Sequence, residues 1–442
     1  MPIVNPHAAG IDIGSRSHFI CVGQDNVREF DVFTSDLHEI ARHLQFHKVE
    51  TVAMESTGFY WQPLFLLLQD YGFEVILVNA RHLKNVKGKK TDVVDSKWIQ
   101  MLHSIGLLSA SFQLDNFTQE LRSYTRHRRR LIEHASSYIS KMNKTLVLMN
   151  IQVSTVLSDL TGKSGRRIIE AIIAGERDAK ILASLTDIRV KASKKVIEKS
   201  LVGDWREEYL FELKQCYEIY NHYWEKIEEC DEQIAKILGN HLSQQEAESG
   251  ESRLSYIPKK HIQKQKNDPT FDLRTYAYQL TKGVDLSEIH GVGITTILTI
   301  LSEVGWNLSK FPTAKHFVSW LGLSPNNKIS GGKILNSRTD KKKNNVAQAL
   351  RISANALRKS KEGYLAHFFK RILFKKGDAV AITATARKIA VIIYNMLTRN
   401  EQFNEIDMKQ YSEKLRKQKV RNIQKQINNF GIEMAELKFA IA

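Results

Sequence analysis

Two long helices with a heptad pattern limit most strongly what this chain can fold into. Residues 117–150 and 205–240 are each expected to form one helix, because apolar side chains recur at alternating steps of three and four. The first seam carries Leu121, Tyr124, Leu131, Ala135, Tyr138, Met142 and Met149, with Arg128 and Thr145 in its gaps. The second carries Leu210, Leu213, Tyr217, Tyr220, Trp224, Ile227, Ile234 and Leu238, and only Asp231 interrupts it. Such seams predict coiled-coil packing, with each other or with another subunit.

A mixture of short strands and helices is predicted for residues 8–105. AAGIDIGS, HFICVG and REFDVF read as strands at hairpin spacing, and TVAME and FEVILVN as strands on either side of the helix FYWQPLFLLLQDYG. DLHEIARHLQFH is an amphipathic helix, and residues 92–105 are helical again. Three successive strands followed by alternating helices and strands is the element order of an RNase H-like (RuvC-like) α/β core.

The charge of the chain favours a polyanionic partner. Its 442 residues include 65 Lys and Arg against 48 Asp and Glu, giving a net charge of +17. Between residues 328 and 376 there are fourteen basic residues and only two acids, and the basic residues alternate with apolar helix positions. This pattern predicts a surface that follows nucleic-acid phosphates. An ordinary solvated basic face is the alternative.

Other compositional features point to the cytoplasm. The three cysteines are far apart and form no CxxC pair, so neither a disulfide framework nor a zinc site is expected. The first residues lack a signal-peptide pattern, and no apolar run approaches about 18 residues, so no membrane span is expected.

Four carboxylates, Asp12, Glu55, Asp92 and Asp95, are candidates for a metal site. Asp12 interrupts an apolar strand, and Glu55 ends another strand. Asp92 and Asp95 are three residues apart on one helix face. Carboxylate oxygens are the ligands that Mg²⁺ prefers, and two such ions can promote phosphodiester chemistry. Each acid alone also fits a turn, a cap or a helix start, but the set predicts a Mg²⁺ site, with a two-metal site as one form.

The second part of the chain offers phosphate-binding glycines and a candidate nucleophile. Gly291 and Gly293 in EIHGVGITT fit a helix–hairpin–helix whose bare amides bind phosphate, or an ordinary helical turn. Ser330 in KISGGK lies between glycines and lysines, which suits a nucleophile but also fits a plain turn. TGKSG at residues 161–165 lacks the first glycine of a phosphate loop and is expected to open a helix.

Nucleic-acid contacts are expected from basic residues near the carboxylates, the first heptad helix and the serine. They are Lys89, Lys90, Arg128, Arg129, Arg130, Lys328, Lys333, Arg338, Lys341, Lys342 and Lys343, together with the amides at Gly291 and Gly293. The expected organisation is a catalytic domain at 1–112, a helical coiled-coil spacer at 113–245, a linker at 246–280, a mostly α-helical C-terminal domain at 281–400 and a charged helical tail at 401–442.

These motifs together resemble the DEDD transposases of bacterial insertion sequences, which are related to the Piv invertase. The N-terminal part carries GIDIG, AMEST and TDVVDSKW, and the second part carries FVSWLGLSPNNKISGGKILNSRT and AITATARKIAVIIYNML. The resemblance implies that Asp12, Glu55, Asp92 and Asp95 bind Mg²⁺ and that Ser330 is the covalent nucleophile, with Ser324 and Ser337 close by. It further implies donor and target DNA, a structured guide RNA and a homo-oligomer, dimer or tetramer, as partners.

Two other functions remain open at this stage. A metal-only, Holliday-junction-like endonuclease would leave Ser330 structural, and a non-catalytic nucleic-acid binder would need none of the acids. The presence of all four acids disfavours the binder.

Overall fold

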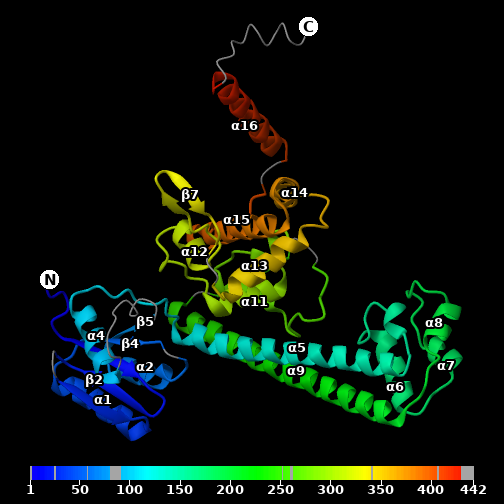
Figure 1. The fold of residues 1–442 in the computed structure, drawn as a ribbon, viewed down its shortest axis with the longest axis horizontal. Coiled ribbons are helices and arrows are strands. Elements are labelled where there is room, and N and C mark those ends of the chain that lie inside the picture. Colours follow the sequence, from blue (N-terminus) through cyan, green and yellow to red (C-terminus); the bar gives the residue numbers. More distant parts are fainter. Residues whose placement is uncertain are drawn as a thin grey trace. The chain divides into compact units, whose positions relative to one another are not determined.

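The computed structural model describes residues 2–23, 26–56, 58–79, 91–250, 252–258, 262–339, 342–405 and 408–429 (Figure 1). The chain divides into two compact units, residues 1–113 and 114–442, and each is described by itself.

Unit 1 is built on a five-stranded mixed sheet in the order β3-β2-β1-β4-β5. β1 pairs antiparallel with β2, which pairs antiparallel with β3, whereas β1, β4 and β5 run parallel. The strands are β1 (Ala8–Ile13), β2 (Ser17–Cys21), β3 (Val27–Asp31), β4 (Thr51–Glu55) and β5 (Glu74–Val78). The helices are α1 (Thr34–Phe46), α2 (Trp61–Asp70) and α4 (Asp92–Ser104). The predicted mixed α/β domain is therefore confirmed.

The two faces of this sheet have different partners. Ile11 and Met54 pack with buried residues of α1 and α2, in the main core of unit 1. Ala53 lies on the other face, where it packs with Ile99 of α4. The amphipathic stripe expected for α1 is buried as predicted: Leu37, Ile40, Ala41 and Leu44. The sheet is thus enclosed between α1 and α2 on one side and α4 on the other.

Two long helices, α5 (Asn116–Leu148) and α9 (Glu207–Ser249), lie side by side in unit 2 (Figure 1). They run antiparallel, because the Phe117 ring stacks on His241 at 3.7 Å and the Tyr138 ring lies 5.7 Å from Tyr223. α9 continues past residue 240, where the second heptad helix was expected to end, and reaches Ser249 inside the expected linker. Leu242 extends the buried stripe, and Gly250 ends the helix with a left-handed φ of 69°.

A small helical insert covers one end of the α5–α9 pair. It contains α6 (Lys163–Ile173), α7 (Ala179–Ser184) and α8 (Lys194–Ser200). Ile168, Ile169 and Ile172 of α6 share a core with Met142 and Leu213 of the long helices. The insert therefore anchors the two long helices at this end.

The rest of unit 2 is mostly helical, as predicted, with one small hairpin. Its elements are α10 (Leu273–Leu280), α11 (Ile294–Glu303), α12 (Ala314–Trp320), β6 (Lys328–Ser330), β7 (Lys333–Asn336), α13 (Asn345–Ala356), α14 (Tyr364–Lys376), α15 (Asp378–Arg399) and α16 (Met408–Asn429). α10 lies inside the expected linker, and it is helical because Leu273, Ala277 and Leu280 form one buried face.

Among the described helices, α15 is the one long and apolar enough to cross a membrane by length and composition. α15 packs against α12, α13 and α14, and its Ala386, Ile389 and Ile393 are buried. Core helices of soluble proteins pass the same test. We therefore treat α15 as the central helix of this region.

Candidate active site and nucleic-acid interface

Asp12 and Glu55 lie side by side at the ends of two parallel strands. The register pairs Ile11 of β1 with Met54 of β4, so the next residues, Asp12 and Glu55, occupy neighbouring positions. In-register residues of parallel strands point to the same face. Because Ile11 and Met54 face α1 and α2, Asp12 and Glu55 lie on the face that α4 covers.

Helix α4 crosses this face antiparallel to β1. The Gln100 side-chain amide donates to the carbonyl of Ala8 at 3.1 Å. Gly10, two residues further along β1, touches the helix so closely that a Cβ there would lie 2.6 Å from the carbonyl oxygen of Ser96. Following β1 towards Asp12 therefore means following α4 towards its N-terminus.

The start of α4 carries the other two acids. A strand rises about 3.3 Å per residue and a helix about 1.5 Å, so the step from Gly10 to Asp12 spans about four helix residues. That step leads to the first turn of α4, which carries Asp92 and Asp95. Thr91 caps this turn, since its hydroxyl accepts from the Val94 N–H at 3.3 Å. The backbone thus places all four acids at one end of unit 1.

The carboxylates do not form a closed metal cage. Within the residues that the structure describes, no three Asp, Glu, His or Cys side chains are close enough to hold one ion. Asp92 is exposed, whereas Asp12, Glu55 and Asp95 are half-buried. Lys89 and Lys90, which were expected to contact nucleic acid here, lie outside the described residues.

Ser330 lies at the tip of the β6–β7 hairpin. Ser330 pairs with Lys333 across a two-residue turn of Gly331 and Gly332, whose φ values are +53° and +75°. Positive φ at both central residues is the requirement of a type I′ hairpin turn, which glycine meets without strain. Ser330 is exposed, as is Ser337, while Ser324 is half-buried. The turn expected from Ser-Gly-Gly is therefore present.

The basic residues near the hairpin are on the surface where they are described. Lys333, Arg338, Lys342 and Lys343 are exposed. Lys341 lies outside the described residues, and so does the side chain of Lys328.

Three consecutive arginines on α5 have three different environments. Arg130 is exposed and Arg129 is half-buried, but Arg128 is 4% exposed. The Arg128 guanidinium donates to Asp231 at 2.5 and 3.2 Å. It also donates to the carbonyl of Asn267 at 3.1 Å. Because this pairing uses Arg128 inside the protein, Arg128 is not placed to contact a nucleic acid.

Gly291 and Gly293 lead into the N-terminus of α11. Gly291 has a φ of +86°, and a Cβ there would lie 2.6 Å from the carbonyl oxygen of Ser353 on α13. Gly293 is the N-cap of α11, and no side chain caps the helix. A cavity of about 560 Å³ adjoins this helix start and is lined by Gln263, Lys266 and His290 among others. This geometry suits both an αα-turn and a phosphate-binding hairpin.

Glu303, at the end of α11, ties three helices together. Arg126 of α5 donates to both carboxylate oxygens of Glu303 at 2.8 Å. The Nε of Arg122 lies 3.1 Å from the Oε2 of the same carboxylate. Asn345 at the start of α13 donates at 2.6 Å. Burial alone would raise the pKa of Glu303, but the hydrogen bonds from Arg126 and Asn345 and the charge of Arg122 outweigh it and lower that pKa. Sequence patterns gave no indication of this link.

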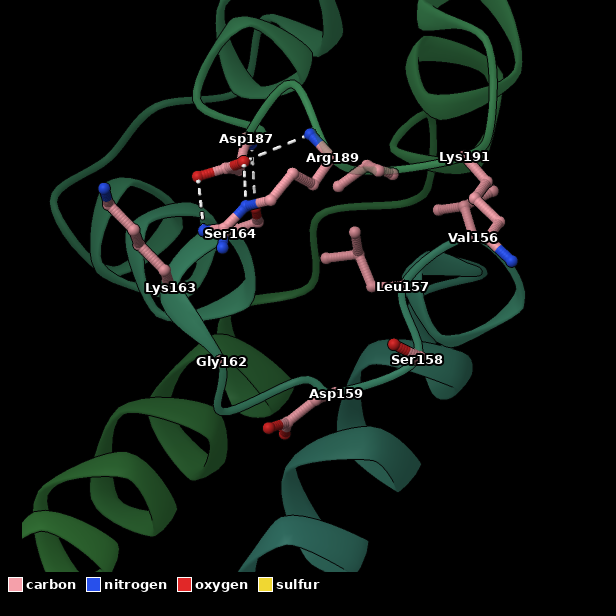
Figure 2. Close-up of a pocket in the computed structure, with 11 residues that line it drawn as sticks. Val156, Leu157, Ser158, Asp159, Gly162, Lys163, Ser164, Asp187, Arg189 and Lys191 are labelled. Atoms are coloured by element: carbon pink, nitrogen blue, oxygen red, sulfur yellow. Dashed lines mark hydrogen bonds and ion pairs between the residues drawn. The ribbon is translucent and has the colours of Figure 1, made fainter. Parts of the chain in front are cut away.

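The TGKSG segment opens α6, as predicted. Gly162 is the N-cap of that helix, and the Ser164 hydroxyl accepts from the backbone N–H of Asp187 at 2.8 Å. Figure 2 shows these residues beside a cavity of about 450 Å³. Arg189 in this cavity is already bonded to Asp187 at 2.8 and 3.1 Å. The segment is therefore a helix start and not a phosphate loop.

Two family models match this chain. Residues 9–151 match the model for DEDD transposases of the IS110 type, described as "Transposase". Residues 285–367 match the model described as "Transposase IS116/IS110/IS902 family". The first match covers unit 1 from residue 9 and all of α5, and the second covers the region of unit 2 that carries Ser330. Together they span about half of the chain. No curated protein matches the chain significantly.

Both matches define the class of the protein as a transposase, an enzyme that acts on DNA. The chain belongs to the DEDD transposases of insertion sequences. This family typically uses a divalent metal.

Proposed function

We propose that this transposase cuts and rejoins DNA with a composite site formed by the four acids and Ser330. Unit 1 supplies Asp12, Glu55, Asp92 and Asp95, and its strand order β3-β2-β1-β4-β5 supports an RNase H-like fold. The register that sets Asp12 beside Glu55, opposite the first turn of α4, is the observation that carries the proposal.

The donor set fits a hard divalent cation. Four carboxylates supply oxygen ligands of the kind that Mg²⁺ and Mn²⁺ prefer. Asp12 would hold Mg²⁺ together with Glu55, Asp92 and Asp95, as one or two ions. Bound there, the metal would stabilise the negative charge that develops on a scissile phosphate. The described side chains do not yet form a cluster of three, so small rotamer changes on binding are part of this proposal.

Ser330 is the proposed nucleophile. Its Oγ would attack the phosphorus, forming a P–Oγ bond and breaking the bond to one deoxyribose oxygen. The serine proton leaves to solvent, and the departing oxygen gains a proton to become a free hydroxyl. Rejoining is the reverse exchange, in which a DNA hydroxyl attacks the serine ester, so no ATP is required. An exposed hairpin tip suits attack on a large substrate.

The surrounding surface would hold nucleic acid. The proposed contacts are Lys89, Lys90, Arg129, Arg130, Gly291, Gly293, Lys328, Lys333, Arg338, Lys341, Lys342 and Lys343. Arg128 is left out because Asp231 engages it in the interior. An element-encoded guide RNA and a dimer or tetramer, with coiled-coil packing of α5 and α9, complete the proposal. Its cellular site would be the cytoplasm, at the bacterial nucleoid.

Trapping on nicked suicide DNA tests the nucleophile. The DNA would be taken from the junctions of this element and supplied with RNA transcribed from its flanks. We expect the wild type to form a protein–DNA adduct and Ser330→Ala to form none. Ser324→Ala and Ser337→Ala are matched controls and should retain the adduct. An adduct with Ser330→Ala would refute the serine role.

The same experiment addresses the rival function. The ordinary turn geometry of Ser330 favours, as a second candidate, a metal-only endonuclease of the Holliday-junction type. In that case Ser330→Ala would still cleave DNA, and no wild-type adduct would appear. Asp12→Asn and Asp92→Asn should abolish cleavage under either function. If both variants recombine normally, the metal site is wrong and nucleic-acid binding without catalysis becomes the better description.

A further inference from the structure

A half-buried lysine, Lys388 of α15, lies against two aromatic rings of α14. Its Nζ is 4.9 Å from the ring centre of Tyr364 and 4.7 Å from that of Phe368. The guanidinium carbon of Arg371 is 5.5 Å from the same Phe368 ring. Two cations from neighbouring helices therefore share one aromatic surface (Figure 1 shows the helices).

Lys388 forms no ion pair with an acid in the described part of the chain. Glu405, which contacts the Tyr364 backbone, has other partners: it lies 3.3 Å from His290 and accepts from the Tyr364 N–H at 3.2 Å. Burial, followed by the charge of Arg371, lowers the pKa of Lys388. The aromatic rings offset part of the cost of this charge. Among the acids that the structure describes, none therefore neutralises the Lys388 ammonium.

The surface around this pair is strongly basic. Lys375 and Lys376 are exposed in the last turn of α14, and Lys370 is exposed one residue before Arg371. Phe374, on the turn after Arg371, is 93% exposed. Exposed cations beside an exposed aromatic ring are typical of surfaces that bind nucleic-acid backbone and stack on bases.

We propose that Lys388 and Arg371 together form a binding site for a backbone phosphate of a bound nucleic acid, called here the phosphate site. A phosphate there would offset the repulsion that Arg371 exerts on Lys388, and Phe368 and Tyr364 would hold the lysine in place. The inference rests on the proposed function, since it assumes that this transposase binds nucleic acid along unit 2. Lys388 lies outside the basic run between residues 328 and 376, so charge counting along the sequence misses it.

A charge-matched pair of variants tests this phosphate site in the full chain. Lys388→Met should weaken binding several-fold and reduce the slope of log affinity against log salt by about 1. Lys195→Met, at an exposed position of α8, removes the same charge and should leave both quantities unchanged. Lys388→Arg, which keeps the charge, should restore most of the affinity.

Thermal unfolding separates binding from structure. Because no acid in the described part of the chain neutralises Lys388, Lys388→Met should melt at or above the wild-type temperature without ligand. A lower melting temperature together with unchanged affinity would assign Lys388 a structural role and overturn the proposal. NMR of ¹³C-methylated lysines supplies a direct signal: inorganic phosphate or an oligonucleotide should raise the pKa of Lys388. An unchanged pKa on saturation would also overturn it.

Separate titrations identify the source of the phosphate. Duplex DNA, single-stranded DNA and RNA would be compared. The nucleic acid whose affinity falls for Lys388→Met is the one that occupies the phosphate site. If the wild type binds nucleic acid and Lys388→Met behaves like Lys195→Met, the proposal of a phosphate site is refuted and the proposed function stands. If the wild type binds none of the three, the proposed function itself fails.

Discussion

Arg128 interrupts the apolar seam of α5, and Asp231 interrupts that of α9. The two side chains lie at the same level of the helix pair and form an ion pair. Asp231 is fully buried and Arg128 nearly so. Asp231 also accepts from the Thr270 N–H at 3.0 Å, and Arg128 donates to the carbonyl of Asn267. A single polar pair within an apolar seam fixes which residues face each other, because any shifted register would bury a charge without its partner. The same pair holds the segment 267–270 against the helices.

Removing one member of this pair should destabilise unit 2 strongly. Asp231→Ala leaves the Arg128 guanidinium buried without its carboxylate, which costs about 3–5 kcal/mol. The double variant Arg128→Met, Asp231→Leu should recover most of that loss, since it completes the apolar seam. Chemical denaturation of each variant measures the difference. Glu229→Ala, which removes an exposed ion pair with Lys226, is the control and should not shift the midpoint. A midpoint near the wild-type value for Asp231→Ala would show that the ion pair does not hold the seam.

At the scale of elements, the contact between β1 and α4 sets the geometry of the acids. A glycine at position 10 lets the helix backbone approach the strand, since a Cβ would lie 2.2 Å from the Gln100 backbone nitrogen. This contact fixes how far along β1 the first turn of α4 reaches. The relative positions of Asp12, Asp92 and Asp95 therefore depend on a residue that carries no functional group.

Gly10→Ala should impair catalysis although it removes no functional atom. The added methyl must push α4 away from β1, at a cost of about 1–3 kcal/mol for overpacking. A displacement of about 1 Å at the acids can lower the rate about 100-fold. Adduct formation and thermal stability would be measured together. Gly23→Ala in the same unit is the control, because no described atom lies within 4 Å of its Cβ position. Normal activity of Gly10→Ala would show that α4 does not set the acid geometry.

At the scale of the whole molecule, the acids and the candidate serine belong to different compact units. Unit 1 ends at Gln113 and holds Asp12, Glu55, Asp92 and Asp95, whereas Ser330 is in unit 2. Unit 1 has a hydrophobic core of its own, formed by the sheet with α1 and α2. The proposed composite site would make the association of the two units a condition for chemistry.

Residues 1–113 by themselves should therefore fold but fail to form the covalent adduct. A single cooperative thermal transition and native-like circular dichroism would demonstrate folding. Adding residues 114–442 as a separate chain should restore part of the adduct if the two units can associate. An isolated unit 1 that is unfolded, or one that forms the adduct alone, would contradict the assignment of the acids and the nucleophile to two separate units.

Local patterns predicted the elements well and the partners of charged residues poorly. The buried face of α1 and the succession of strands and helices in unit 1 follow from side-chain periodicity, which is read within a dozen residues. The end of α9 was misjudged because polar residues after 240 hid the buried Leu242. Arg128 was expected on a nucleic-acid surface, since a run of three arginines does not reveal that Asp231, about a hundred residues away, engages one of them. Glu303 and Lys388 were missed for the same reason.

The sequence by itself determined the family, the α/β character of unit 1, the two heptad helices and the concentration of positive charge, because each depends on residue type and spacing along the chain. Only the tertiary structure decided that Asp12 lies beside Glu55, that Gly10 sets the level of α4, and that Lys388 shares an aromatic surface with Arg371. Burial and pairing of a charge depend on segments brought together by folding, and their free energies are not encoded in local periodicity.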